Sequence, residues 1–246
     1  MKQGIFEESS SQLYPIGMQL REQGSLKRLF RYSKAAAAIT CLARGVVNSN
    51  YCPGATDHED ENGFEGVLQA EAAIGQMYVD LADTANRAVN YYQGGQFVAY
   101  GTTIFHQHYI VKSDAGDGSK VRIYLSAPIV KEKITTSMGV TAYLNPYSAV
   151  ANTDSGRYDS FVGVNLIPVT SGYYFWLQTA GPCIITPMVY FGDSIAERDC
   201  YFHMDGTITI AATADPSTYS PQRAGYLLSK TVSGYGDLWM MLQLDQ

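Results

Sequence analysis

The sequence is poor in the residues that build most metal and redox sites. Its 246 residues include only four cysteines and four histidines. The cysteines, Cys41, Cys52, Cys183 and Cys200, form no CxxC pair and no short Cys/His array, which argues against a zinc site. We therefore expect no metal and no other cofactor. The spacing leaves the redox state of the four cysteines open.

Long apolar runs are also missing. Residues 1–8 lack the apolar core of a signal peptide, and no uninterrupted apolar stretch is long enough to cross a membrane. We therefore expect the chain to be made in the cytoplasm, where thiols stay reduced, and to have no membrane partner.

Signatures of the common enzyme classes do not occur either. There is no Gly-x-Ser-x-Gly elbow, no P-loop and no dinucleotide-binding glycine pattern. His106 and His108 would share one face of a strand at a spacing that metals use. However, only His58 and His203 remain as further imidazole ligands, and nothing in the sequence brings them close. We therefore predict that the chain is not an enzyme.

What is abundant is aromatic and β-favouring. Aromatic residues make up 12% of the chain, with 19 tyrosines, and charged residues 16%, values of a globular protein rich in β-structure. Short strand signals recur between turn signals along the chain. They cover Ile74–Leu81, Gln96–Tyr100, Phe105–Lys112, Val121–Leu125, Val140–Leu144, Val162–Pro168, Tyr173–Thr179, Cys183–Thr186, Tyr201–Met204, Thr207–Ala211, Gly225–Ser229 and Leu238–Leu244.

This spacing predicts a mainly β fold, an antiparallel β-sandwich or a β-barrel-like domain, with an extended N-terminal arm. At most one short helix is expected, over Lys34–Arg44, where four alanines precede the stop at Gly45. Ser113–Ser119 is expected to be a hairpin connection. The acidic stretch Asp57–Gly63 is interpreted as a solvated loop, with a calcium site as the alternative.

The segment Gly172–Pro182 is predicted to be the central strand. Tyr174, Phe175, Trp176 and Leu177 place large side chains on both pleat faces, so both faces are expected to pack against protein. Gly181 and Pro182 would then either end the strand or bend it into the next one.

Charge is distributed unevenly. Residues 1–50 carry seven basic and three acidic side chains, which leaves a net charge of −10 for the rest of a chain whose total is −6. We therefore expect a basic arm and docking segment at 1–50 and a main β domain at 51–246, the latter either single or divided near residue 160. The candidate docking residues are Arg21, Lys27, Arg28, Phe30, Arg31 and Tyr32.

Such a cluster of cations and aromatic rings can meet nucleic acid or an acidic protein surface. The acidic remainder of the chain would repel a phosphate backbone, so we expect no nucleic-acid partner.

The order of several segments resembles that of tailed-bacteriophage head decoration proteins, also called cement or minor capsid proteins. The segments that carry the likeness are Tyr14–Gly17, Arg28–Tyr32, the small residues ending in Gly45, Asn145–Tyr147, Gly163–Val164 with Pro168, Gly172–Cys183, Gly225–Leu228 and Leu238–Leu244. The resemblance implies a structural virion protein on the capsid exterior that binds the major capsid protein, cements the head lattice and forms a homo-oligomer, most often a trimer.

A carbohydrate- or receptor-binding β module of a virion is the alternative function. It would use aromatic loops around Tyr147, Tyr158 and Tyr219. The oligomer number, the lattice position and the host stay open.

Overall fold

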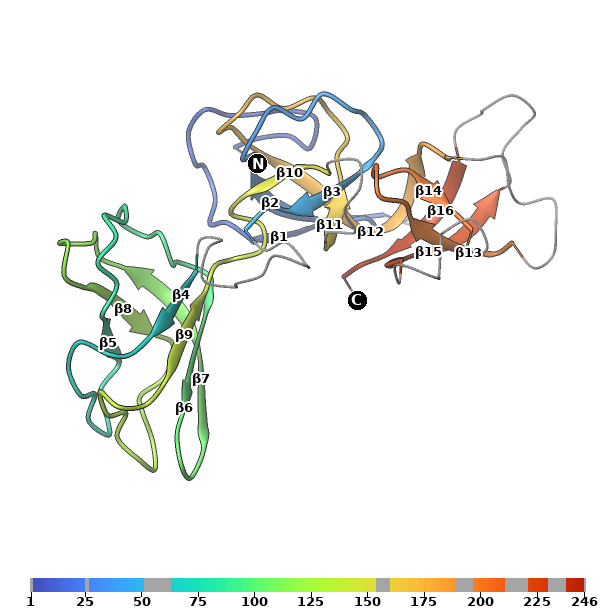
Figure 1. Ribbon diagram of the computed structural model, residues 1–246. Coiled ribbons are helices and arrows are strands. Elements are labelled where there is room, and N and C mark those ends of the chain that lie inside the picture. Colours follow the sequence, from blue (N-terminus) through green and yellow to red (C-terminus); the bar gives the residue numbers. More distant parts are fainter. Residues whose placement is uncertain are drawn as a thin grey trace. The chain divides into compact units, whose positions relative to one another are not determined.

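Every regular element that the structure describes is a β-strand. The computed structural model describes residues 2–24, 27–50, 63–153, 160–188, 197–210, 221–229 and 238–245. Its strands form two curled antiparallel sheets, which confirms the mainly β prediction (Figure 1).

The candidate segment Lys34–Arg44 for the one short helix that the prediction allowed is not helical. Ala35 instead forms a bridge with Val150, and Ile39 forms one with Val169. Pairing with residues far along the chain overrides the local helix propensity of the short alanine run, which has few turns over which to gain stability.

The chain divides into two compact units. Unit 1 comprises Met1–Gly54 and Pro146–Gln246, and unit 2 comprises Ala55–Asn145. This division differs from the expected one, in which 1–50 is a separate arm and the remainder is continuous or divides near 160. The charge imbalance that suggested the arm says nothing about which strands pair, and strands from 1–50 pair with strands beyond 146.

Unit 1 contains a ten-stranded sheet. Most of it follows the order β10-β3-β11-β12-β16-β15-β13-β14, and β2 joins it by pairing with β12 and β1. Its strands are β1 (Gln19–Arg21), β2 (Leu29–Lys34), β3 (Gly45–Asn48), β10 (Val150–Asn152), β11 (Phe161–Val164), β12 (Tyr174–Ile185), β13 (Asp199–Phe202), β14 (Ile208–Thr209), β15 (Arg223–Ser229) and β16 (Leu238–Gln243).

Strand β12 is the longest element, with 12 residues, and its two halves pair with different strands. Residues 174–180 pair with β2, whereas residues 180–185 pair with β16. The change occurs at Gly181, whose φ of 92° lies in the left-handed region that favours glycine. A β-carbon there would also lie 2.9 Å from the Cα atom of Arg28. Of the two expectations for Gly181 and Pro182, the structure therefore shows a bend within one strand.

The core beside β12 is built around Trp176. Its ring packs edge-on against Tyr32, with 5.0 Å between centroids, and is tilted against Tyr14 at 5.2 Å. Gln3 joins this cluster, because its carbonyl accepts a hydrogen bond from the Trp176 indole and its side-chain oxygen accepts one from the Tyr32 hydroxyl. On the opposite face of β12, Phe175 and Leu177 belong to a second buried cluster. Both faces of β12 therefore pack against protein, as predicted.

Unit 2 contains a six-stranded sheet in the order β4-β9-β6-β7-β8-β5. Its strands are β4 (Phe64–Gly66), β5 (Tyr78–Leu81), β6 (Gln96–Tyr100), β7 (Phe105–Ser113), β8 (Val121–Leu125) and β9 (Val140–Tyr143). The chain just after β4 reaches β5 through a bridge between Leu68 and Leu81 and a hydrogen bond from the Gln69 amide to the Asp80 carbonyl, at 2.8 Å. These contacts join the two edge strands, so the sheet curls around its own core.

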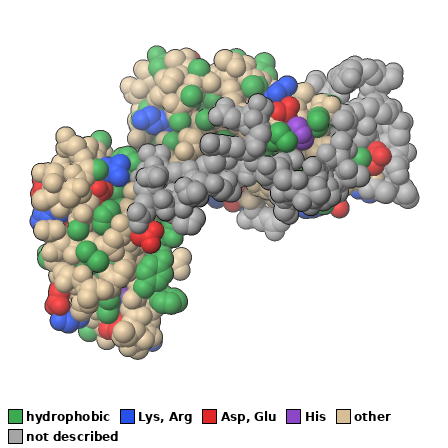
Figure 2. Space-filling view, viewed as in Figure 1, with side chains coloured by type: hydrophobic (Ala, Val, Ile, Leu, Met, Phe, Trp, Pro, Cys, Tyr) green, Lys and Arg blue, Asp and Glu red, His purple; other side chains and the backbone are tan. Residues whose placement is uncertain are grey.

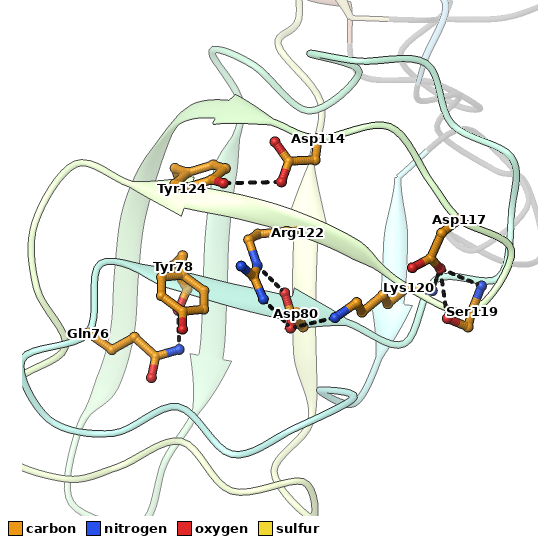
Figure 3. A network of polar contacts seen from close by, with 9 residues as sticks. All are labelled: Gln76, Tyr78, Asp80, Asp114, Asp117, Ser119, Lys120, Arg122 and Tyr124. Atoms are coloured by element: carbon orange, nitrogen blue, oxygen red, sulfur yellow. Dashed lines mark hydrogen bonds and ion pairs between the residues drawn. The ribbon is translucent and has the colours of Figure 1, made fainter.

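A polar network holds β5 to β8 on the outer side of this sheet (Figure 3). Asp80 accepts two hydrogen bonds from the Arg122 guanidinium, at 2.7 and 2.9 Å, and one from the Lys120 ammonium at 3.1 Å. The Arg122 hydrogen bonds lower the pKa of Asp80 and keep it ionised. At the hairpin between β7 and β8, where a connection was expected, Asp117 accepts hydrogen bonds from the amides of Ser119 and Lys120.

Replacing Trp176 with alanine should lower the free energy of unfolding by about 3–5 kcal/mol, because it empties the centre of an aromatic cluster. Urea denaturation followed by far-UV circular dichroism measures the loss. Trp239→Ala is the matched control, since Trp239 is the only other tryptophan and is 42% exposed. Its loss should be about 1 kcal/mol or less. Equal losses in the two variants would contradict the assignment of Trp176 to the core.

Candidate interaction sites

The structure separates the six candidate docking residues into exposed and buried groups. Arg21 ends β1 and Lys27 precedes β2, and both side chains are exposed. Phe30 and Tyr32 are fully buried in the cluster around Trp176. Their side chains stabilise unit 1 and are not available to a partner. The sequence does not distinguish the buried from the half-buried residues of β2, because both faces of this strand carry buried side chains.

The two remaining cations are held by carboxylates. Arg28 forms two hydrogen bonds to Glu22, both 2.7 Å long, across the β1–β2 hairpin. Arg31 donates to Asp245 at 2.5 Å and to the carbonyl of Gly17 at 3.0 Å. Each carboxylate raises the pKa of its arginine through these hydrogen bonds. Arg21 and Lys27 form no ion pair with the residues that the structure describes, so they are the free cations of this hairpin.

The predicted core strand lies where the sequence placed it. Phe175, Trp176 and Leu177 are buried, and Tyr174 is half-buried at the start of β12. Tyr174 stacks on Tyr32 with 6.0 Å between centroids. These residues are structural, which agrees with the expectation that they form a core strand.

A pocket of about 420 Å³ opens beside the β1–β2 hairpin, where β12 bends. Four of its lining side chains are large, apolar and exposed, at 63%, 52%, 45% and 42%: Phe6, Leu42, Ile184 and Trp239. The ion pair of Arg28 with Glu22 lies at the same pocket. The free cations Arg21 and Lys27 are direct chain neighbours of this pair. The sequence did not signal this pocket, because its residues come from six separate segments.

One polar atom in the pocket lining is left without a partner. Gln178 is fully buried, and its amide nitrogen donates to the carbonyl of Pro182 at 2.9 Å. Its side-chain oxygen accepts no hydrogen bond within the described part of the chain. A buried acceptor without a donor is costly. Because this oxygen is itself shielded from solvent, the pocket offers a guest chiefly its apolar lining.

The cysteines in the described core do not behave as nucleophiles. Burial raises the pKa of Cys183 and of Cys200 to about 12, so both thiols stay neutral near pH 7. Both belong to one buried apolar cluster and neither forms a disulfide. Cys41 is also a free thiol, and Cys52 lies outside the described residues.

No group of three or more histidine, cysteine or acidic side chains lies close enough to hold a metal ion in the ranges that the structure describes. The acidic stretch Asp57–Gly63, with its alternative of a calcium site, lies outside them except for its last residue. Those same ranges contain no helix long and apolar enough to cross a membrane.

His106 and His108 point into the core of unit 2. They are 2% and 8% exposed, and their rings stack with 6.2 Å between centroids. Neither ring nitrogen of His106 has a hydrogen-bond partner among the described residues. Burial lowers the pKa of both histidines, and for His108 the neighbouring His106 lowers it further. The pair is therefore held in its neutral form.

The aromatic loops expected for the alternative function are only partly visible. Tyr147 is half-buried, and the Arg31 guanidinium lies 5.9 Å from its ring centroid. Tyr158 and Tyr219 lie outside the described residues. Tyr147 thus packs within unit 1 instead of standing free on a loop.

No protein-family model, no curated protein and no solved structure matches the chain. Its function is therefore inferred from its own geometry and from the segment order described above.

Unit 2 should lose stability on acidification. The folded pKa values of His106 and His108 lie below the unfolded value of about 6.5, so folding favours the neutral rings. This stability is present above pH 6.5 and is lost as the pH falls below it, by up to about 1.4 kcal/mol per pH unit for each histidine. Hydrogen exchange of β6 to β8 between pH 7 and pH 5, corrected for intrinsic rates, measures the loss.

The variant His106→Leu removes one titrating ring together with its two unpaired nitrogens. Its unit 2 should be at least as stable as the parent at pH 5 and should depend less on pH. The same pH dependence in the variant would show that His106 does not contribute.

Proposed function

We propose that the chain is a structural virion protein that binds the outer surface of a phage capsid and cements the head lattice. The major capsid protein is the proposed partner, a homo-oligomer, most often a trimer, is the proposed state, and the capsid exterior is the proposed location. The segment order described above supports the proposal. So does one structural observation: Arg21 and Lys27, the free cations of the β1–β2 hairpin, directly adjoin Glu22 and Arg28 in the chain, and these two line an apolar pocket with exposed side chains.

This combination suits docking onto an acidic protein surface. Free cations at a rim speed association by electrostatic attraction, whereas exposed apolar side chains supply most of the affinity when they are buried. An apolar side chain of the capsid protein could fill the pocket and bury its exposed apolar lining. Many copies, each with a modest interface, then stabilise the assembled lattice by mass action.

We propose that the chain docks through the folded β1–β2 hairpin and not through a separable N-terminal arm. Residues 29–34 are strand β2, which pairs along β12 and buries Phe30 and Tyr32. A deletion of residues 1–34, which an arm would tolerate, should unfold unit 1. Point substitutions on the exposed side of the hairpin are the appropriate test.

The location is tested by labelling a C-terminal tag on purified virions of the phage that encodes the chain. Negative-stain electron microscopy should show a fixed number of labels distributed over the head. Labels confined to the tail or its fibres would refute the cement function and favour receptor binding.

The double variant Arg21→Glu/Lys27→Glu should bind heads about three- to thirtyfold more weakly, because it replaces attraction at the rim with repulsion. The loss should shrink as salt is added. Co-sedimentation of the purified protein with heads that lack it measures binding. Lys131→Glu/Lys133→Glu makes the same change of charge in unit 2 and should bind as the parent does.

Trp239→Ala tests the pocket in the same assay, since this variant is expected to stay folded. It should bind about tenfold or more weakly, because a buried interface tryptophan commonly contributes 2 kcal/mol or more. Undiminished binding of both Trp239→Ala and the Arg21/Lys27 variant would refute this docking surface.

A further inference from the structure

The outer face of β9, β6 and β7 carries exposed aromatic rings. Along β7, the side chains of Phe105, Gln107 and Tyr109 point outward, while His106 and His108 point into the core. Phe105 is 73% exposed, the highest value among the large hydrophobic residues that the structure describes. Hydrophobic side chains gather on the side of this unit where Figure 1 places β6 and β7 (Figure 2).

The strand register arranges the outward side chains in rows. Gln96 on β6 lies between Tyr143 on β9 and Tyr109 on β7. In the next row, Val98 lies between Thr141 and Gln107, and in the third row Tyr100 lies opposite Phe105. Neighbouring strands are about 4.8 Å apart, so rings and amides alternate over a continuous surface.

Two of these rings are in direct contact. Tyr100 packs edge-on against Phe105 with 5.8 Å between centroids. Burial and the phenol of Tyr100 raise the pKa of Tyr143. Tyr100, Tyr109 and Tyr143 are 46%, 46% and 39% exposed. The face thus presents several fixed rings to solvent.

The loop that carries this edge is held in place. Between β6 and β7, the Glu132 carboxylate accepts hydrogen bonds from the amides of Thr103 and Ile104, each 3.0 Å long. The carboxylate is thereby committed to the loop, and its pKa is lowered by these bonds. The rings at the loop end therefore stand on a fixed backbone. Less conformational entropy is then lost when a ligand binds.

The face is almost uncharged. None of the outward side chains of β6, of β9 and of Phe105–Tyr109 on β7 is charged, and Glu65 on β4 borders the face opposite Thr141. The side-chain amides of Gln96 and Gln107 make no hydrogen bond with the described residues. Single-stranded nucleic acid needs cations beside the rings, so this face does not suit it.

We propose that this face binds an uncharged glycan. The C–H faces of sugar rings pack on exposed aromatic rings, and sugar hydroxyls both donate and accept hydrogen bonds, as the free amides of Gln96 and Gln107 do. A protein partner would bury these amides between the aromatic rings. It would then have to supply a hydrogen-bond donor and an acceptor, correctly placed, for each amide. Hydroxyl groups around a sugar ring meet this need in many orientations.

This inference goes beyond the proposed function and does not depend on it. The face belongs to unit 2, whereas the docking hairpin and its pocket belong to unit 1. Head binding and glycan binding are measured separately, so either can fail alone.

The test uses the purified full-length chain with four uncharged probes: maltohexaose, cellohexaose, chitohexaose and dextran. Saturation-transfer NMR should show transfer to at least one probe at millimolar concentration. Phe105→Ala should weaken that binding about three- to tenfold, as expected for the loss of one aromatic contact. Gln107→Ala should weaken it as well.

Phe6→Ala is the matched control, because Phe6 is an exposed phenylalanine of unit 1, 63% exposed. It should bind the glycan as the parent does, and both phenylalanine variants should keep the parent's thermal stability. Phe105→Tyr retains a ring and should restore most of the affinity.

Several results would overturn the proposal. No transfer to any of the four probes would do so, as would equal weakening by Phe105→Ala and Phe6→Ala. If Phe105→Ala instead abolishes self-association in sedimentation velocity, or abolishes head binding, the face is a protein interface and the glycan assignment is wrong.

Discussion

The backbone hydrogen bonds between β12 and its neighbouring strands hold unit 1 together. One half of the strand pairs with β2 and the other half with β16, so a single 12-residue strand ties the N-terminal strands to the C-terminal ones. The burial of Trp176 against Tyr32 and Tyr14 reinforces the first half. Because β12 bends at Gly181, it also shapes the pocket that lies beside Pro182 and Cys183. Core and candidate docking site thus share one element.

Unit 2 is built on a smaller sheet, whose edge strands are β4 and β5. The contact of Leu68 with Leu81 joins those edges, and the resulting core encloses His106 and His108. In the part of the chain that the structure describes, the ring nitrogens of His106 have no hydrogen-bond partner. The same alternation that turns these histidines inward turns Phe105 and Tyr109 outward. The expected loss of stability at low pH and the exposed aromatic face of the unit therefore both follow from one strand, β7.

The two candidate surfaces differ in the chemistry they offer. The unit 1 surface joins the free cations Arg21 and Lys27 to an apolar pocket, which suits an acidic protein partner. The unit 2 face has rings and free amides but almost no charge, which suits a neutral sugar. A virion protein that both attaches to the head and holds a glycan would use surfaces of these two kinds.

Local signals predicted the β class, at least part of each expected strand listed above, and the buried strand around Trp176, because alternation and turn residues act over short stretches of chain. The sequence also identified the cations of the β1–β2 hairpin. The pairing of distant strands was needed to show that residues 1–50 belong to the core, that Lys34–Arg44 is not helical, and that Phe30 and Tyr32 are buried. The residues of the pocket and of the aromatic face are likewise brought together by strand pairing and register. Register and pairing between distant segments depend on side-chain packing across the sheet, which no local pattern records.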